Sequence, residues 1–169
     1  MAFTAQDVKK LREMTNVGMM DCKKALQATD GDMDKAVDWL REKGLAKAAK
    51  KADRIAAEGV AYATVVDGVG VAIEVNSETD FAAKTDAFMD LVKNLAVVVA
   101  QQNPADVEAL KACTYPGTQL TVTEIMQEKV MSIGENMQIR RFARFPENTS
   151  VAYVHAGGTH GVLVNLAVE

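Results

Sequence analysis

The pattern of apolar and polar positions predicts a strand followed by a helix in the middle of the chain. From Val69 to Val75 every second residue is apolar, which is the period of a half-buried β-strand. From Phe88 to Val99 apolar residues recur at steps of three and four, which is the period of an amphipathic helix. The strand must therefore become a helix through the polar corner 77–81.

This corner carries an aromatic ring with no larger apolar neighbour than alanine. Thr79 and Asp80 can each accept a hydrogen bond from a backbone N–H at the start of a helical turn, and Phe81 follows them. Two interpretations are open. The ring folds back onto its own domain as a plug, or it points outward into a pocket on a partner, because Phe fixes few rotamers for much buried area.

Residues 4–44 are expected to form a compact module of three short helices. Small apolar faces alternate with turn signals, and the first helix should break at 16–18. The third helix should stop at Gly44. The expected N-caps of the three helices are Thr4, Asp21 and Asp32.

Met19 and Met20 are expected in the loop before the second helix of this module. One interpretation is core filling, which is the usual role of methionine. The other is an adaptable contact patch, because a loop with glycine and two apolar residues cannot easily bury both.

Residues 45–58 are alanine-rich with interleaved charge, and they predict a helical linker that Gly59 ends. The linker carries a run of cations whose side chains either face solvent or contact phosphates. The cations are Lys47, Lys50, Lys51 and Arg54.

The following pattern predicts an α+β core with antiparallel strands. Residues 60–66 form a first strand, and Asp67-Gly68 is a two-residue hairpin turn into the second strand. The long helix should end at Asn103-Pro104. One or two helical turns at 105–112 should precede a helix that starts at Thr121 or Thr123 and stops at Gly134, and the third strand should span 137–145. The expected domains are 1–44, the linker 45–58, the first core half 59–146 and a second half beginning at 147–169.

The last part of the chain repeats its first hairpin. Val151-Ala152-Tyr153 matches Val60-Ala61-Tyr62 at an offset of 91 positions, and the same offset aligns residues 161–166 with 70–75. It also aligns Glu169 with Glu78, so the second copy stops where its helix would begin. A two-stranded hairpin alone is marginal in water. We expect a longer natural product that supplies this helix, or cover from another segment or subunit.

Composition narrows the class of protein. The chain has 169 residues, 49% of them apolar, and a net charge of −4, which argues against a general nucleic-acid binder and for a protein that meets other proteins. Its two cysteines, Cys22 and Cys113, form neither a disulfide framework nor a zinc cluster. The sequence shows no signal peptide and no apolar stretch of membrane-spanning length, so the cytoplasm is expected.

No catalytic set stands out in the sequence. The phosphate-binding GxxxxGK[ST] motif, GxSxG and HExxH are absent, and no cofactor is expected. His155 and His160 lie in a glycine-rich hairpin loop without a third ligand nearby. An enzyme would need a pocket that gathers Glu74, Asp80 or His155.

Three motifs together resemble the bacterial translation elongation factor Ts family, and the resemblance covers the whole chain. They are Met19-Met20-Asp21-Cys22-Lys23-Lys24-Ala25-Leu26, then Thr79-Asp80-Phe81, then Ile133-Gly134-Glu135-Asn136 followed by Ile139-Arg140-Arg141. The resemblance implies a guanine nucleotide exchange factor that binds elongation factor Tu, GDP-bound and nucleotide-free. It also implies an N-terminal ubiquitin-associated-like module and a core of two similar halves.

The resemblance also implies the contact residues. In the family the Asp-Phe pair, here Asp80 and Phe81, contacts the nucleotide-binding domain of elongation factor Tu, and the ring disturbs the nearby magnesium site. The family usually has valine next, where this chain has Ala82. The implied partner-binding residues are Thr79, Asp80, Phe81 and Ala82 at the magnesium site, and Arg12, Met19, Met20, Ile133, Gly134, Glu135 and His155 elsewhere.

Two alternatives to an exchange factor remain open. One is a binding module in which residues 4–44 recognise a ubiquitin-like surface, which a pull-down of the partner would decide. The other is an enzyme of the kind described above. No direct nucleic-acid partner and no membrane are expected, and a homo-oligomer is a possible assembly.

Overall fold

The computed structural model describes residues 3–167, and it confirms an α+β fold of helices and antiparallel sheet. Two compact units share the chain. Unit 1 comprises the described residues up to Asp53 together with Gln127–Gly134, and unit 2 comprises Arg54–Met126 together with the described residues from Glu135 onward. Among the described residues, no helix has the length and apolar character that crossing a membrane requires.

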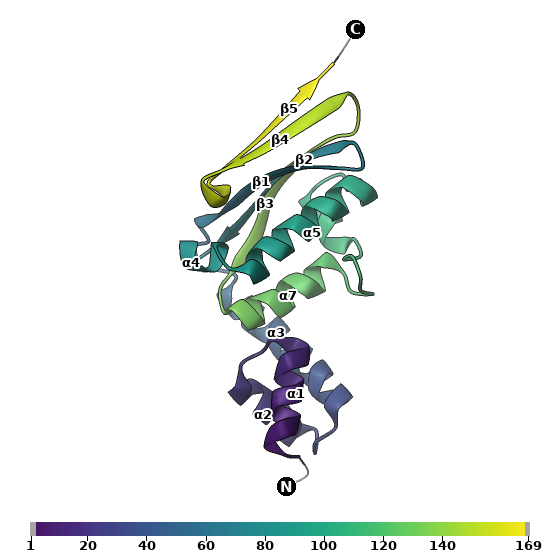
Figure 1. Ribbon diagram of the computed structural model, residues 1–169. Helices are drawn as coiled ribbons and strands as arrows, with labels where there is room; N and C mark the ends of the chain where they lie inside the picture. Colours follow the sequence, from purple (N-terminus) through teal and green to yellow (C-terminus); the bar gives the residue numbers. More distant parts are fainter. Residues whose placement is uncertain (1–2, 168–169) are drawn as a thin grey trace. The chain divides into compact units, whose positions relative to one another are not determined.

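Unit 1 is built from three helices, as the pattern predicts: α1 (Ala5–Thr15), α2 (Met19–Ala28) and α3 (Met33–Lys51) (Figure 1). Thr4 caps α1 in a reciprocal capping box with Asp7, and the Asp32 side chain accepts from the Lys35 N–H at the start of α3. The buried core consists of Val8, Leu11, Val17, Cys22, Ala25, Leu26, Ala36 and Leu40, with Met131 packed against it. The ubiquitin-associated-like character of this module stays a prediction.

The expected cap at Asp21 is wrong. Helix α2 starts three residues earlier, with Gly18 as its N-cap, so Met19 and Met20 lie in its first turn and not in a loop. Asp21 also lies in that turn, where the helix dipole favours a negative charge. Its carboxylate pairs with Lys47 Nζ at 2.7 Å.

The expected helix end at Gly44 is also wrong, because α3 continues to Lys51. A glycine inside a helix costs only about 1 kcal/mol relative to alanine, and the strong helix formers that follow outweigh it. Gly44 is buried, and a Cβ built on it would lie 3.4 Å from Met131 Sδ. The linker is therefore helical only up to Lys51, and Gly59 lies in a strand rather than at a helix end.

Unit 2 contains a three-stranded antiparallel sheet in the order β1–β2–β3. Its strands are β1 (Glu58–Val66), β2 (Val69–Ser77) and β3 (Met137–Phe145). The predicted turn between β1 and β2 is confirmed: Asp67 and Gly68 have φ of 51° and 83°, both positive, which a two-residue hairpin turn of this hand requires.

Helices cover one face of this sheet (Figure 1). The long helix α5 (Asp86–Gln102) is capped by Thr85 and buries Phe88, Leu91 and Leu95, and it ends at Asn103 in the left-handed conformation. The short helix α4 (Asp80–Ala83) precedes it in the chain, and the short helix α6 (Val107–Ala112) follows it. Helix α7 (Val122–Ile133) begins in unit 2, and its last residues are grouped with unit 1.

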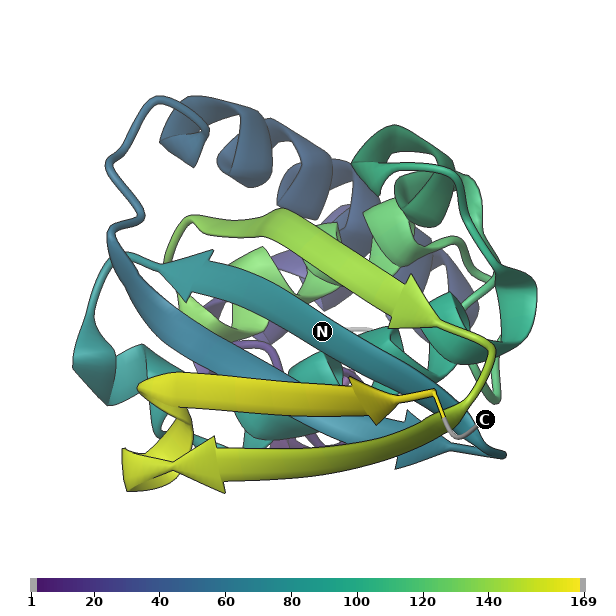
Figure 2. The ribbon, with the colours of Figure 1, turned by 90° about the horizontal axis from the view of Figure 1, so that it is seen from above.

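The second hairpin predicted from the repeat is present, as β4 (Thr149–His155), the 3₁₀ turn η1 (Ala156–Gly158) and β5 (His160–Leu166). It forms a separate two-stranded sheet and packs on the face of β1 and β2 opposite α5 (Figures 1 and 2). Glycines allow the close approach. A Cβ on Gly161 would lie 2.7 Å from the Ala61 carbonyl oxygen, and one on Gly158 would lie 2.6 Å from Val60 Cγ1.

The pairing inside the second hairpin differs from a strict repeat. An identical hairpin would pair Val151 with Leu166, whereas the structure pairs it with Val164. The longer turn at residues 156–159 replaces the two-residue turn of the first hairpin and shifts the strands by two residues. An even shift keeps each side chain on its original face. The expected alignment of Glu169 lies outside the described residues.

Candidate functional site

Phe81 is the most informative side chain of the corner after β2. It lies in the single turn of α4, and its side chain is 81% exposed. The interpretation of Phe81 as a plug in its own core is therefore wrong. The two residues that follow it, Ala82 and Ala83, face the core instead and are buried.

Local hydrogen bonds build this short helix. The Thr79 hydroxyl accepts from the Ala82 N–H at 3.2 Å, which confirms Thr79 as the N-cap. Ala82 is thus a supporting residue below the corner in the free chain, since only 6% of it is exposed. A four-residue helix has no stability of its own, so its orientation depends on the contacts beneath it.

Asp80 lies next to the ring and is paired within its own turn. Its carboxylate lies 2.5 Å from Lys84 Nζ. The hydrogen bond from Lys84 holds the pKa of Asp80 below its ordinary value, and desolvation acts in the opposite direction. Asp80 is consequently a charged group at the rim of the corner, with a neighbouring cation that a partner would have to replace or accommodate.

Beneath the corner, residues from two distant parts of the chain meet. The Glu135 carboxylate accepts from the Thr79 N–H at 3.0 Å and from the Thr79 hydroxyl at 2.6 Å. The Glu78 carboxylate accepts from the Asn136 N–H at 2.6 Å. Of the predicted site residues, the structure therefore brings Glu135 together with Thr79.

The other predicted residues of this motif lie at the end of α7. Gly134 has a φ of 91° and ends that helix, with its N–H donating to the Val130 carbonyl. Ile133 is half-buried. Both residues are grouped with unit 1, whereas the Phe81 corner belongs to unit 2.

Arg12, Met19 and Met20 form a second exposed group, within unit 1. Arg12 lies in the last turn of α1 and the two methionines in the first turn of α2, with 43% of Met19 and 64% of Met20 exposed. Core filling by these methionines is therefore wrong. Met14 is also 55% exposed on α1, and sequence reasoning missed it because its position in the helical period carries no distinct signal.

Comparison with known proteins identifies the family. A family model described as elongation factor TS matches residues 78–169. Elongation factor Ts of Trichlorobacter lovleyi is 53% identical over all of this chain and 56% of the relative, and that of Magnetococcus marinus is 49% identical over 98% of this chain and 55% of the relative. The chain belongs to the elongation factor Ts family. It spans little more than half the length of these curated relatives.

His155, the remaining residue that the resemblance to the elongation factor Ts family implies, lies at the end of β4. Its Nδ1 is 3.0 Å from the Tyr153 hydroxyl, and its ring centroid is 6.1 Å from that of His160 on the opposite strand. The turn that follows lies at the same end of unit 2 as α4 in both ribbon views (Figures 1 and 2). Within residues 3–167, no three His, Cys, Asp or Glu side chains gather as a metal site.

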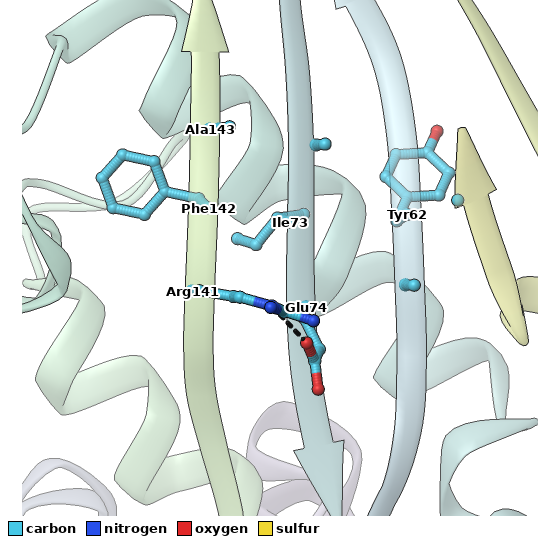
Figure 3. Close-up of a pocket in the computed structure, with 9 residues that line it drawn as sticks. Tyr62, Ile73, Glu74, Arg141, Phe142 and Ala143 are labelled. Atoms are coloured by element: carbon cyan, nitrogen blue, oxygen red, sulfur yellow. Dashed lines mark hydrogen bonds and ion pairs between the residues drawn. The ribbon is translucent and has the colours of Figure 1, made fainter. Parts of the chain in front are cut away.

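A pocket of about 240 Å³ on the sheet bears on the enzyme alternative (Figure 3). Its lining contains Glu74, whose carboxylate pairs with Arg141 at 2.7 Å, together with Tyr62, Ile73 and Phe142. Neither Asp80 nor His155 lines it. The three candidate groups of an enzyme are thus not gathered in this pocket.

Three of the four cations of the predicted linker make contacts within the chain, namely Lys47, Lys51 and Arg54. Lys47 pairs with Asp21, and the Lys51 ammonium donates to the Gly134 carbonyl within unit 1. Arg54 pairs with Glu78 at 3.4 Å within unit 2. These contacts do not arrange the cations as a phosphate groove.

Proposed function

We propose that this chain binds elongation factor Tu and promotes release of its GDP, with Phe81 as the side chain that enters the partner. The observation that carries the proposal is the exposure of the ring: 81% of Phe81 faces solvent on a helix whose own alanines are buried. An apolar ring presented in this way contributes to binding only when a partner covers it.

The size of the effect indicates that Phe81 does not act alone. Burying one phenylalanine contributes about 1.5–3 kcal/mol, which is roughly one to two powers of ten in affinity. Efficient exchange needs a wider interface. We assign its second part to Arg12, Met19 and Met20, which are exposed on the helical module, and this supports treating that module as a domain of its own.

The mechanism follows from linkage between two ligands of the same partner. Elongation factor Tu holds GDP through phosphate contacts and through a magnesium ion that neutralises charge. A protein that binds better when this ion is displaced must weaken nucleotide binding. Nucleotide weakens binding of that protein by the same factor, because the coupling is reciprocal. In this scheme Asp80 and Phe81 supply the displacement, and this chain makes and breaks no covalent bond.

The same proposal includes action in the cytoplasm, where translation takes place. The Ile133-Gly134 end of α7 and His155 are proposed as further contacts with elongation factor Tu. Recognition of a ubiquitin-like surface by residues 4–44, and assembly of several copies, stay predictions that no contact in the structure favours.

The test is the release of fluorescent GDP from elongation factor Tu, followed by stopped flow with this chain and its Phe81→Ala variant. We expect at least a tenfold slower release at equal concentration, with an unchanged unfolding midpoint because the ring contributes little to the core. Val151→Ala is the matched control, since Val151 is an apolar side chain of unit 2 that is 58% exposed on a different element. Equal release by wild type and Phe81→Ala would remove the proposal.

A further inference from the structure

The corner that carries Phe81 is held by hydrogen bonds from side chains to backbone. These bonds continue the β2–β3 ladder beyond its last backbone pair. Ser77 and Met137 are the final partners in the antiparallel register. Along the same register, Glu78 comes opposite Asn136, and Thr79 comes opposite Glu135. At each of these two positions a carboxylate replaces the missing backbone acceptor, and it accepts from the N–H of the opposite segment.

Glu135 has a second contact that reaches α4. One of its oxygens accepts from the Thr79 hydroxyl at 2.6 Å, which turns the remaining lone pairs of that hydroxyl toward the helix. The same hydroxyl accepts from the Ala82 N–H at 3.2 Å. Glu135 is therefore linked through Thr79 to the first turn of the helix that presents Phe81.

The contact between Glu78 and Asn136 is held by buried groups. Asn136 is only 5% exposed, and its side-chain amide donates to the Arg54 carbonyl at 2.7 Å. Arg54 in turn lies 3.4 Å from the Glu78 carboxylate and offsets its charge. The Ser77 hydroxyl, fully buried, donates to the Thr79 carbonyl at 2.9 Å. The backbone on both sides of the corner is thus held by charge-assisted or buried hydrogen bonds.

We propose that Glu78, Glu135 and Asn136 are positioning residues, which hold α4 so that Phe81 stays exposed in one orientation. In particular, Glu135 acts through Thr79 rather than through direct contact with the partner, because each of its two oxygens accepts a hydrogen bond from Thr79, which holds the carboxylate against the corner. The step from positioning to nucleotide release rests on the proposed function. The positioning itself is a property of the free chain and can be measured there.

The first experiment measures amide hydrogen exchange by NMR in the free chain with Glu135→Ala. We expect exchange at Thr79 and Ala82 to become at least tenfold faster, while Leu95 in the core of α5 is unchanged. Glu147→Ala is the charge-matched control, because Glu147 is an exposed carboxylate outside this group. Unchanged exchange at Thr79 and Ala82 would overturn the proposal.

A second pair of variants keeps the test valid if Glu135→Ala does not fold. Thr79→Val removes the hydroxyl that links Glu135 to the helix. We expect faster hydrogen exchange at the Ala82 amide and unchanged exchange at the amide of residue 79. Glu135→Gln keeps the shape of the side chain and one acceptor oxygen. We expect hydrogen exchange at the Thr79 and Ala82 amides to increase less than in Glu135→Ala. An Ala82 amide that exchanges as slowly in Thr79→Val as in wild type would contradict the proposed link.

The last experiment is a double-mutant cycle on GDP release from elongation factor Tu. Glu135→Ala should slow release three- to tenfold in the wild-type chain and by less than 1.5-fold in the Phe81→Ala background, since it acts through the ring. Losses that multiply would show that Glu135 contacts the partner directly, against the proposal. If Phe81→Ala itself has no effect, the proposed function fails, while the exchange measurement in the free chain still decides the positioning.

Discussion

At the scale of single residues, the Asp80–Lys84 pair sets the charge beside the exposed ring. The pair spans one helical turn, and the Lys84 hydrogen bond is the main reason that the pKa of Asp80 is lowered. Because the pair is exposed, its effect on folding stability is small. The direction of its pH dependence is nevertheless defined. The contribution of the pair to folding stability is present above the unfolded-state pKa of Asp80 and is lost as pH falls through the lower folded-state value.

Lys84→Met should therefore raise the pKa of Asp80 toward its ordinary value, since the largest cause of the shift is removed. The measurement is a titration of the Asp80 carboxyl carbon by NMR between about pH 2 and pH 6, around the ordinary value of an aspartate. Asp32 serves as the internal control, because its lowered pKa depends first on the Lys35 backbone N–H, which the substitution leaves in place. An Asp80 titration that does not move would show that Lys84 does not hold the carboxylate in solution.

The residue scale also shows where sequence reasoning reaches and where it stops. The capping role of Thr79 was predictable, because a cap is a local matter of one side chain and the next three residues. The exposure of Phe81 was not, since it depends on whether anything from the rest of the fold covers the corner. The contact between Thr79 and Glu135 follows from the strand register and is invisible in either local pattern.

At the scale of elements, the length of α3 shows how propensity outweighs a single helix breaker. Gly44 interrupts the pattern of unit 1, yet the residues up to Lys51 continue the helix. The glycine faces the thioether of Met131, and an added Cβ would make an ordinary contact at 3.4 Å. A small side chain is therefore compatible with this position, and the helix has a propensity deficit there.

Gly44→Ala should stabilise unit 1 by about 0.5–1 kcal/mol, the propensity difference between alanine and glycine in a helix. Met131 is unbranched and can shift to admit the methyl group. The measurement is urea unfolding followed by circular dichroism, with helicity at zero denaturant as a second readout. A lower midpoint would mean that the contact with Met131 is tighter than the structure indicates.

The packing of the second hairpin depends on a glycine in the opposite way. A Cβ on Gly161 would lie 2.7 Å from the Ala61 carbonyl oxygen, and backbone cannot move aside as a flexible side chain can. Gly161→Val should therefore destabilise unit 2 by about 1–3 kcal/mol, the usual cost of overpacking. Val162→Ala is the control on the adjacent, outward-facing position, and we expect it to have a much smaller effect. Equal urea midpoints for Gly161→Val and wild type would show that the hairpin does not pack on β1 as described.

The elements themselves were largely predictable, and their packing was not. Strand β3 and the turn at Asp67-Gly68 follow from alternation and turn chemistry, which are local. The second hairpin was also predicted, but its stacking on the face of the first sheet depends on Gly158 and Gly161 meeting a distant strand. A pattern along one strand cannot show which distant backbone it approaches.

At the scale of the whole molecule, helix α7 is divided between the two units. Its residues Gln127–Gly134 are grouped with unit 1, and Met131 packs on the core of that unit. Removal of residues 1–53 would leave Met131 without this core. The chain should nevertheless keep a cooperative unit 2, because its sheet and α5 have their own buried core.

We therefore expect the chain lacking residues 1–53 to unfold in a single urea transition and to bind elongation factor Tu more weakly than the whole chain. Met131→Gln in the shortened chain should lower its tendency to aggregate, since the exposed thioether is replaced by a polar group. The same substitution in the whole chain should destabilise unit 1, which is the control for the packing of Met131. Loss of the cooperative transition in both shortened chains would contradict the independence of unit 2.

The outer face of the second hairpin is the largest apolar feature left uncovered in unit 2. Its side chains Val151, Tyr153, Val162, Val164 and Leu166 are 47–59% exposed. By the repeat, these five positions correspond to Val60, Tyr62, Val71, Ile73 and Val75 of the first hairpin. There Val60, Ile73 and Val75 are at most 3% exposed, within the packed core that α5 helps to form. The same sequence pattern is thus buried in one copy and exposed in the other, and contiguous exposed apolar surface of this kind promotes association.

Val164→Lys should therefore lower the binding of an apolar fluorescent dye several-fold, because it places a charge in the middle of this face opposite Val151. The unfolding midpoint should stay nearly constant, since the side chain points away from the first sheet. Thr64→Lys is the matched control, a new lysine on a strand of the first hairpin outside this face. If dye fluorescence is the same for Val164→Lys and wild type, this face does not bind the dye in solution. The exposure of the face in the single chain would then be wrong as a description of the protein in solution.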